Sequence, residues 1–263
     1  MEPLRCKVVL LGDGKVGKTC LLHSYANGLE YLAKRRDYNK TLLENYELLL
    51  PINDGEEGGG SSRLVRLSSW DTAGQEEFDE LRRMCYTSST SPVELSGAWS
   101  VPPPLPVCEV SVLILCFAWD DPQSLTSVQM RWYREIRRLE HEMTFSSSTT
   151  HRRPFNVVLC GTKFDLRVEA DQRGTKDGMV TREQAYNVQQ SINADALVIC
   201  SSKMGLGVQD VFHTALLLWL QNQSPYTGRL ISTSPNDSMS CKGGNTTEKR
   251  SALIVARRSC HLL

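Results

Sequence analysis

The chain has 263 residues, enough for one domain with a full hydrophobic core plus loops and tails, and we expect one domain rather than two small ones. Thirty basic residues balance thirty acidic ones, so the overall charge does not favour nucleic acid as a partner. The nine cysteines are odd in number, lack C-x-x-C spacing and lie mostly in apolar runs, which indicates reduced thiols. Because no stretch has the pattern of a secretory leader or a membrane span, we expect a protein that is neither secreted nor transmembrane.

The first predicted elements are a strand over residues 7–11 and a helix over residues 19–25, and the segment between them matches G-x-x-x-x-G-K-[ST]. In such a segment, glycines let backbone N–H groups turn toward phosphate oxygens, and the following helix adds its positive end. Lys18 can reach the outer phosphates, and the hydroxyl of Thr19 can hold Mg²⁺. The pattern alone also occurs by chance, but its place between a strand and a helix favours a phosphate-binding loop. The residues expected to contact the phosphates are Gly12, Asp13, Gly14, Lys15, Val16, Gly17, Lys18, Thr19 and Cys20.

Two strands are expected next, one over residues 41–50 that ends at Pro51 and one over residues 63–70. The glycine- and serine-rich tract near 53–62, which lies between them, is typical of a flexible connection. The sequence therefore predicts an antiparallel hairpin with a long loop.

The second of these strands runs into the sequence D-T-A-G-Q at residues 71–75, which is far more specific than the glycine loop. Asp71, at the end of a strand, can order the water shell of a bound Mg²⁺. The backbone N–H of Gly74 can reach a terminal phosphate, and the side chain of Gln75 can position a water molecule. These three roles belong to one phosphate site.

Polar, proline-rich sequence near residues 86–108 predicts an insertion loop, and a second insertion is expected near 141–154. The prolines of the first insertion could bind an aromatic groove on a partner, although an exposed linker is favoured. Between the insertions, the apolar run 110–119 predicts a central parallel strand. A helix is expected to begin at Pro122, with its arginines on a solvated face rather than on nucleic acid. Its apolar positions are Leu125, Val128, Trp132, Ile136 and Leu139.

A further strand over residues 155–160 leads into the sequence T-K-F-D at residues 162–165. The carboxylate of Asp165 can accept two N–H bonds from the N1 and N2 edge of guanine, which adenine does not offer, so guanine is the expected base. An ordinary aspartate at a strand end is the alternative. Within this sequence, the residues expected to bind the base are Thr162, Lys163 and Asp165.

The last predicted elements are a helix that begins with a capping box at Thr181, a strand over residues 196–200 and an apolar helix over residues 211–220. Backbone N–H groups in the turn after that strand can meet the guanine carbonyl. A serine-rich turn is weak support by itself. The residues concerned are Ser201, Ser202 and Lys203.

Four motifs of this chain, each at a strand end, resemble those of the Ras superfamily of small GTPases. In chain order they are the glycine loop, D-T-A-G-Q, T-K-x-D and S-S-K. The Rho/Rac branch is the most similar. Residues 12–22 are similar to the Rho sequence G-D-G-A-V-G-K-T-C-L-L, residues 70–81 to W-D-T-A-G-Q-E-x-[FY]-D-x-L, and residues 161–167 to G-T-K-L-D-L-R. The likeness covers most of residues 4–221.

The resemblance implies a doubly wound α/β fold, in which a mostly parallel six-stranded sheet has helices on both faces and nucleotide at the carboxyl ends of its strands. It implies GTP, GDP and Mg²⁺ as ligands, with Thr41 of the first switch as a second Mg²⁺ hydroxyl. Gln75, Lys18 and Thr41 would be the catalytic residues. The partners of this monomer would be an exchange factor, a GTPase-activating protein and effectors, and hydrolysis would be slow without the activating protein.

The sequence departs from the Rho pattern at positions with specific roles. Lys15 replaces a small residue beside the phosphates, Lys40 replaces the proline before the switch threonine, and Ser202 replaces an alanine near the base. Rho regulators and effectors therefore cannot be assumed to bind. Lys15 in particular puts the approach of an activating arginine in question.

Residues 225–263 are expected to form a disordered basic tail that follows a GTPase domain over residues 1–224. The last four residues resemble a C-a-a-X box with Cys260 as the prenylated residue, although His261 is not aliphatic, and an unmodified tail is the alternative. A prenyl chain and basic residues together would anchor the protein to a membrane. We therefore expect it at the cytoplasmic face of the plasma membrane or endomembranes, with a cytosolic pool.

The expected function is a molecular switch that cycles between GTP and GDP states and controls effector binding in signalling, in the cytoskeleton, polarity or trafficking class. The alternative is a nucleotide-binding scaffold that has lost hydrolysis. The two differ in whether affinity for a partner depends on GTP versus GDP.

Overall fold

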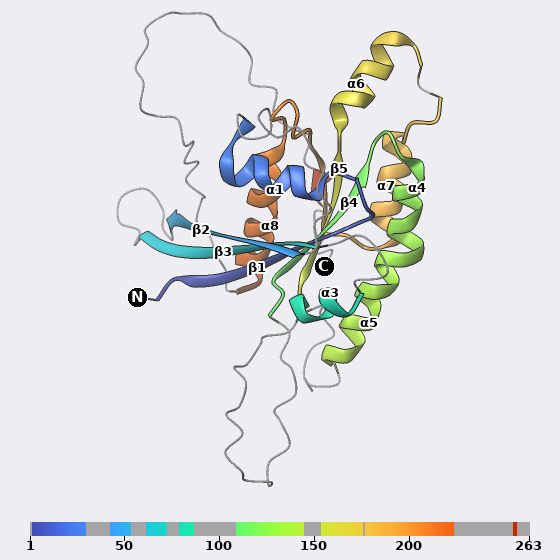
Figure 1. Ribbon diagram of the computed structural model, residues 1–263. Helices are drawn as coiled ribbons and strands as arrows, with labels where there is room; N and C mark the ends of the chain where they lie inside the picture. Colours follow the sequence, from blue (N-terminus) through green and yellow to red (C-terminus); the bar gives the residue numbers. More distant parts are fainter. Residues whose placement is uncertain are drawn as a thin grey trace, which may run out of the picture.

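The computed structural model of the chain describes residues 2–29, 43–53, 62–72, 79–86, 109–144, 154–175, 177–223 and 255–256. Its core is one sheet with the strand order β2-β3-β1-β4-β5-β6-β7 (Figure 1). The six predicted strands are present, and all neighbours among them are parallel except β2 and β3. This arrangement confirms the predicted doubly wound α/β fold.

The parallel strands form the centre of the sheet. Every residue of β4 and β5 is buried, as expected for strands that have helices over both faces. The parallel strands are β1 (Leu4–Leu11), β3 (Ser62–Thr72), β4 (Val112–Ala118), β5 (Asn156–Thr162) and β6 (Ala196–Ile199).

Helices cover the two faces of this sheet (Figure 1). On one face, α1 (Lys18–Asn27) and α8 (Val208–Gln223) pack against Val8 and Leu10 of β1. Val9 and Leu11 belong to the core of the other face, because successive side chains of a strand alternate. The helices over that face are α3 (Asp79–Tyr86), α4 (Pro122–Ser127), η2 (Val128–Trp132), α5 (Tyr133–Thr144) and α7 (Arg182–Ser191). No helix in the described part of the chain has the length and apolar character that crossing a bilayer requires.

The edge strand β2 (Leu43–Asn53) is longer than the sequence predicted, because it continues through Pro51. Pro51 is paired with Leu64 of β3, so the prediction that this proline ends the strand is wrong. A proline removes one N–H donor, which an edge strand tolerates because one side of its ladder has no partner strand. The predicted antiparallel hairpin itself is confirmed.

The helix predicted from Pro122 is one continuous rod made of α4, η2 and α5, in which η2 is a single π-helical turn. The capping box at Thr181 is present, because its side chain accepts a hydrogen bond from the N–H of Gln184 and the Gln184 side chain accepts one from the N–H of Thr181. Residues 141–144, assigned above to an insertion, form the last turn of α5. The remaining residues of the three expected insertions lie almost wholly outside the described residues.

Three elements are additional to those predicted. α3 has only eight residues, and the apolar residues of α6 (Phe164–Arg173) do not follow a helical period, so neither gives a clear helical signal in the sequence. The two-residue strand β7 (Val255–Ala256) pairs antiparallel with β6 and extends the sheet on that side. The other residues of the expected tail lie outside the described residues, and the domain boundary near residue 224 stays a prediction.

The predicted motifs all lie at the carboxyl ends of parallel strands. They therefore meet along the side of the sheet where these strands end. Residues 12–19 follow β1, Lys163 follows β5, and Ser201 lies two residues beyond β6. At the opposite edge, the chain enters β3, β4 and β5 after the segments 54–61, 87–108 and 145–153. The direction of the strands thus separates the motifs, at their carboxyl ends, from the three expected insertions, which precede their amino ends.

Candidate functional site

The glycine loop, residues 12–19, connects β1 to α1 in a conformation that depends on its glycines. Gly17 has φ 101° and immediately precedes the first residue of α1. Gly12 has φ 142°, and a Cβ placed on it would lie 2.3 Å from the carbonyl oxygen of Cys116 in β4. The backbone therefore passes against the end of β4 more closely than any other residue type allows. This close approach leaves the first turn of α1 facing the edge of the sheet.

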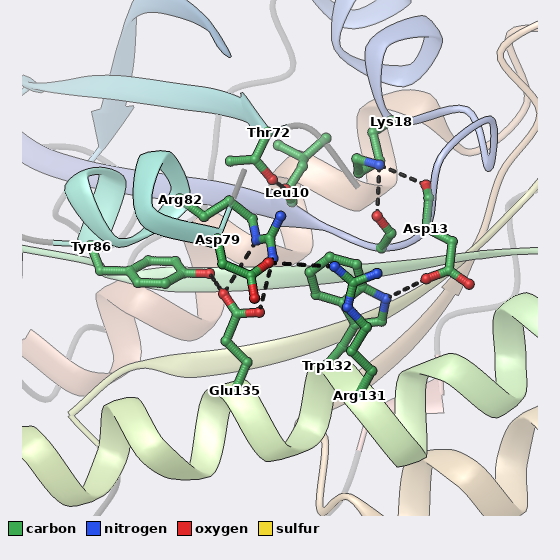
Figure 2. Close-up of polar contacts among 11 residues, drawn as sticks. Leu10, Asp13, Lys18, Thr72, Asp79, Arg82, Tyr86, Arg131, Trp132 and Glu135 are labelled. Carbon is green, nitrogen blue, oxygen red and sulfur yellow. Dashed lines mark hydrogen bonds and ion pairs between the residues drawn. The ribbon is translucent and has the colours of Figure 1, made fainter. Parts of the chain in front are cut away.

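Lys18 lies across the loop rather than extending into solvent (Figure 2). Its Nζ donates to the carbonyl oxygens of Gly12 and Asp13, both at 2.8 Å, and the residue is 5% exposed. Burial lowers the pKa of this ammonium, and the negative charge of Asp71 opposes that effect. An anion bound in the loop would stabilise the charged form of Lys18, so the site is suited to phosphate.

Thr19 and Asp71 place a hydroxyl and a carboxylate next to each other beside the loop. The hydroxyl of Thr19 donates to Oδ2 of Asp71 over 2.5 Å, and Asp71 is fully buried near the end of β3. The neighbouring Thr72 donates to the carbonyl oxygen of Leu10 at 2.7 Å, which fixes the end of β3 against β1. A hydroxyl and a carboxylate at this distance are the ligand types that Mg²⁺ prefers, so these residues fit the predicted magnesium site.

The second half of the site is built around Asp165, a residue in the first turn of α6 that is 6% exposed. Its Oδ1 accepts a hydrogen bond from the hydroxyl of Ser201 at 2.6 Å, and Nζ of Lys203 lies 3.6 Å from its Oδ2. The Ser201 hydroxyl also accepts from the backbone N–H of Met204 at 3.2 Å. Ser202, next to them, is half-buried. The turn after β6 therefore holds the Asp165 carboxylate in one orientation.

Thr162 and Lys163 connect the two halves of the site. The hydroxyl of Thr162 contacts the carbonyl oxygen of Val16 in the glycine loop and lies 2.9 Å from that of Phe117 in β4. Lys163 has φ 55° and directly precedes α6, and its Nζ lies 3.3 Å from Oδ2 of Asp120. Thus the residues predicted to bind phosphate and those predicted to bind the base lie in one continuous arrangement.

Four predicted site residues, Thr41, Gly74, Gln75 and Cys260, lie outside the described residues, and their roles stay predictions. The structure also brings residues to the site that sequence reasoning missed. Trp132 donates from Nε1 to Oδ1 of Asp13 at 2.8 Å, and Asp120 pairs with Lys163. No local pattern marks either residue, because Trp132 matches a core position at helical spacing and Asp120 is an ordinary polar residue after a strand.

These features define a P-loop nucleotide-binding protein. They are a glycine loop between the first strand and first helix, a lysine that lies across the loop, and an aspartate near the end of a neighbouring strand. A sequence profile of the Ras family matches residues 7–93 and 104–220. The chain belongs to the Ras family, and it is a Rho-like small GTPase as the sequence predicted.

Its relatives include several fungal Rho proteins. The chain is 34% identical over 227 residues to GTP-binding protein rho4 of Schizosaccharomyces pombe, an alignment that covers 84% of this chain and 89% of the relative. It is 30% identical over 256 residues to GTP-binding protein RHO1 of Saccharomyces cerevisiae, with 96% of this chain and 95% of the relative covered. It is 35% identical over 216 residues to rho1 of S. pombe, with 81% and 85% covered.

Proposed function

We propose that the chain binds GTP and GDP together with Mg²⁺ and acts as a switch whose affinity for effector proteins depends on the bound nucleotide. The observation that carries this proposal is the buried Asp165 carboxylate, held by Ser201 at the same edge of the sheet as the phosphate loop. A fixed carboxylate recognises the two N–H groups of guanine, while Lys18 and the loop recognise phosphate. Base and phosphate selectivity are thus supported by one arrangement of residues.

Several residues would hold Mg²⁺ and take part in hydrolysis. The hydroxyls of Thr19 and Thr41 would be direct ligands, and Asp71 would act through the ion's water shell. Bound Mg²⁺ would neutralise charge that develops on the phosphate oxygens. Lys18 would hold the outer phosphates, and Gln75 would orient the water whose oxygen attacks the terminal phosphorus as the bond to the leaving GDP oxygen breaks. Gly74 would offer its backbone N–H to the terminal phosphate.

The Gln75→Leu variant tests this function directly. We expect single-turnover hydrolysis of bound GTP to slow at least about tenfold, because leucine cannot orient water. GDP affinity should stay the same, since Gln75 is not expected to bind the base or the β-phosphate. Equal hydrolysis rates in the two proteins would refute the role of Gln75.

The intrinsic reaction is proposed to be slow, with an activating protein that supplies an arginine. In the described part of the chain, Arg82 and Arg131 lie near the glycine loop, but both are paired with the carboxylate of Asp79. The scaffold alternative is not favoured, because Lys18, Thr19 and Asp71 keep the chemistry of nucleotide binding. Partner affinity that did not change between GTP and GDP would nevertheless support it.

Exchange factors, activating proteins and effectors are the partner classes proposed for this switch, and the chain is proposed to act as a monomer. Prenylation of Cys260, together with basic residues of the tail, is proposed to anchor it to the cytoplasmic face of a membrane. Replacing Cys260 with Ser should remove the lipid mass and shift the protein from membranes to the cytosol. An unchanged mass and distribution would refute the lipid anchor.

A further inference from the structure

A cluster of polar and aromatic side chains connects the glycine loop to the helices on one face of the sheet (Figure 2). At its centre is Trp132, the last residue of the π-helical turn η2, with a fully buried side chain. Its indole Nε1 donates a 2.8 Å hydrogen bond to Oδ1 of Asp13 in the loop. Packing of the Trp132 ring in the core does not by itself require this hydrogen bond.

Asp13 is held at two points. Its side chain accepts from Trp132, and its backbone carbonyl oxygen accepts from Nζ of Lys18 at 2.8 Å. Any rotation of Asp13 therefore moves the backbone of the loop and the position of Lys18 together. Because the peptide groups of this loop are the expected phosphate ligands, the Trp132 hydrogen bond acts on the orientation of the phosphate site.

The Trp132 ring in turn contacts two arginines. The guanidinium carbon of Arg131 lies 4.4 Å from the ring centroid, and that of Arg82 lies 4.9 Å away. Both distances are within the range of favourable cation–π contacts. Asp79 pairs with both arginines, which links the first residue of α3 to the two residues that contact the ring.

Arg82 anchors α3 to this cluster. It is 1% exposed, and its Nε lies 3.3 Å from Oε1 of Glu135 in α5. Burial disfavours the charged guanidinium, but Glu135 and Asp79 outweigh that effect and raise the pKa of Arg82. Tyr86 donates to the same Glu135 at 2.6 Å. Because a buried guanidinium is costly without its carboxylate, α3 cannot move away without disturbing the surroundings of the Trp132 ring.

We propose that Trp132 is a positioning residue for the phosphate loop, and that α3 controls it, so that displacement of α3 accelerates nucleotide release. The connection runs from α3 through Arg82 and Glu135 to the ring, and from the indole N–H to Asp13. α3 begins four residues after Gln75, so a partner that binds next to the D-T-A-G-Q sequence would act on this helix. The inference rests on the proposed binding of guanine nucleotide by the loop.

The test measures release of fluorescent GDP from the full chain in the presence of Mg²⁺ and an excess of unlabelled GDP. Trp132→Phe keeps an aromatic ring next to the arginines but removes the N–H donor. We expect release to be about ten- to a hundredfold faster, the range for loss of one hydrogen bond to a charged group. Trp219→Phe is the matched control, because Trp219 is a buried indole in the core on the opposite face of the sheet.

Two further comparisons separate positioning from general loosening of the fold. Asp13→Ala should accelerate release, and combining it with Trp132→Phe should add little, because both changes break one hydrogen bond. Glu135→Gln should accelerate release about twofold or more in the wild-type background and have no further effect in Trp132→Phe. The absence of a further effect in Trp132→Phe would show that α3 acts through the indole N–H of Trp132.

Several outcomes would overturn the inference. Unchanged release in Trp132→Phe, additive effects with Asp13→Ala, or equal acceleration in Trp219→Phe would refute the role of the indole N–H. Unchanged release in Glu135→Gln would refute control by α3. If the wild-type protein bound no guanine nucleotide, the proposed function would be wrong, whereas normal GDP binding with unchanged Trp132→Phe kinetics would refute only this inference.

Discussion

Ser201 and Asp165 lie 36 residues apart in the chain, yet the Ser201 hydroxyl donates a 2.6 Å hydrogen bond to the Asp165 carboxylate. Both side chains are buried, and the same hydroxyl accepts the backbone N–H of Met204. The carboxylate expected to recognise the base is thus aligned by a residue from the turn that follows another strand. The proposed recognition of the base would therefore depend on the side chain of Ser201 as well as on backbone groups.

Replacing Ser201 with Ala should weaken GDP binding about tenfold. The change removes one hydrogen bond to a charged group and leaves the Met204 N–H without its acceptor. Isothermal titration with GDP on the nucleotide-free protein measures the effect. Ser191→Ala is a suitable control, because that hydroxyl bonds to Gln129 and to the carbonyl oxygen of Val188, away from the base site.

Replacing Asp165 with Asn should weaken guanine nucleotide binding about a hundredfold or more, because an amide offers a donor where guanine also offers donors. The same variant should bind xanthine nucleotides better than the wild type does, since xanthine has a carbonyl where guanine has its amino group. Competition of GDP and XDP against a fluorescent nucleotide checks both effects. A wild-type preference for guanine that survived in Asp165→Asn would contradict the role of this carboxylate.

Lys15 has φ 66°, in the left-handed region that residues with a Cβ rarely adopt. Lys15→Gly should raise the free energy of unfolding by about 0.5 kcal/mol, because relief of the steric cost exceeds the added chain entropy. Lys15→Val should lower it by at least about 1 kcal/mol, because a β-branched side chain fits this conformation worst. Urea unfolding of the nucleotide-free proteins gives the ranking. Equal stabilities would show that the loop relaxes at this residue.

Gly161, in β5 just before Thr162, is closely covered by aromatic rings. A Cβ at this position would lie 2.4 Å from Nε1 of Trp119 and 2.8 Å from Cζ of Phe117. Gly161→Ala should therefore lower the free energy of unfolding by about 1–3 kcal/mol, the usual cost of overpacking. Trp119→Leu should recover part of that loss in the Gly161→Ala background, and urea unfolding of all four proteins tests this. Independent, additive losses would mean that the Trp119 ring is not the obstacle.

Burial of His213 in α8 lowers the pKa of its imidazole, and Asp210 opposes the effect. The folded chain then binds the proton less tightly than the unfolded chain, whose pKa is about 6.5. The His213 contribution to the free energy of unfolding therefore falls as the pH drops below about 6.5. In His213→Asn, stability should decline less between pH 7.5 and pH 5.5, as measured by urea unfolding at both values. An identical decline in both proteins would contradict this.

The candidate site could be predicted from the sequence where it depends on short, local patterns. Glycines that must adopt positive φ, the lysine of the loop and an aspartate after an apolar strand all leave contiguous signals, so Gly12 to Thr19, Asp71 and Asp165 could be identified. The strands were predicted because continuous apolar runs are needed in a sheet buried on both faces.

Other features depend on where an element lies in the assembled fold. Pro51 is acceptable only because β2 is an edge strand, and the residues of β2 do not encode that position. The pairs Trp132–Asp13 and Lys163–Asp120 join segments far apart in sequence, with no local pattern in either partner. α3 has only eight residues, and the apolar residues of α6 do not follow a helical period, so tertiary context determines both helices more than local sequence does.

The nucleotide-binding motifs and the expected insertions lie at opposite ends of the strands of the sheet. The expected insertions return to the sheet at the amino ends of β3, β4 and β5, while the nucleotide-binding motifs follow the carboxyl ends. A lengthened segment at the amino ends of these strands leaves the register of the strands, and with it the spacing of Gly12, Thr162 and Ser201, unchanged. In a protein built in this way, the connections at the amino ends of these strands can change and create new partner specificity. The rate of nucleotide hydrolysis need not change with them.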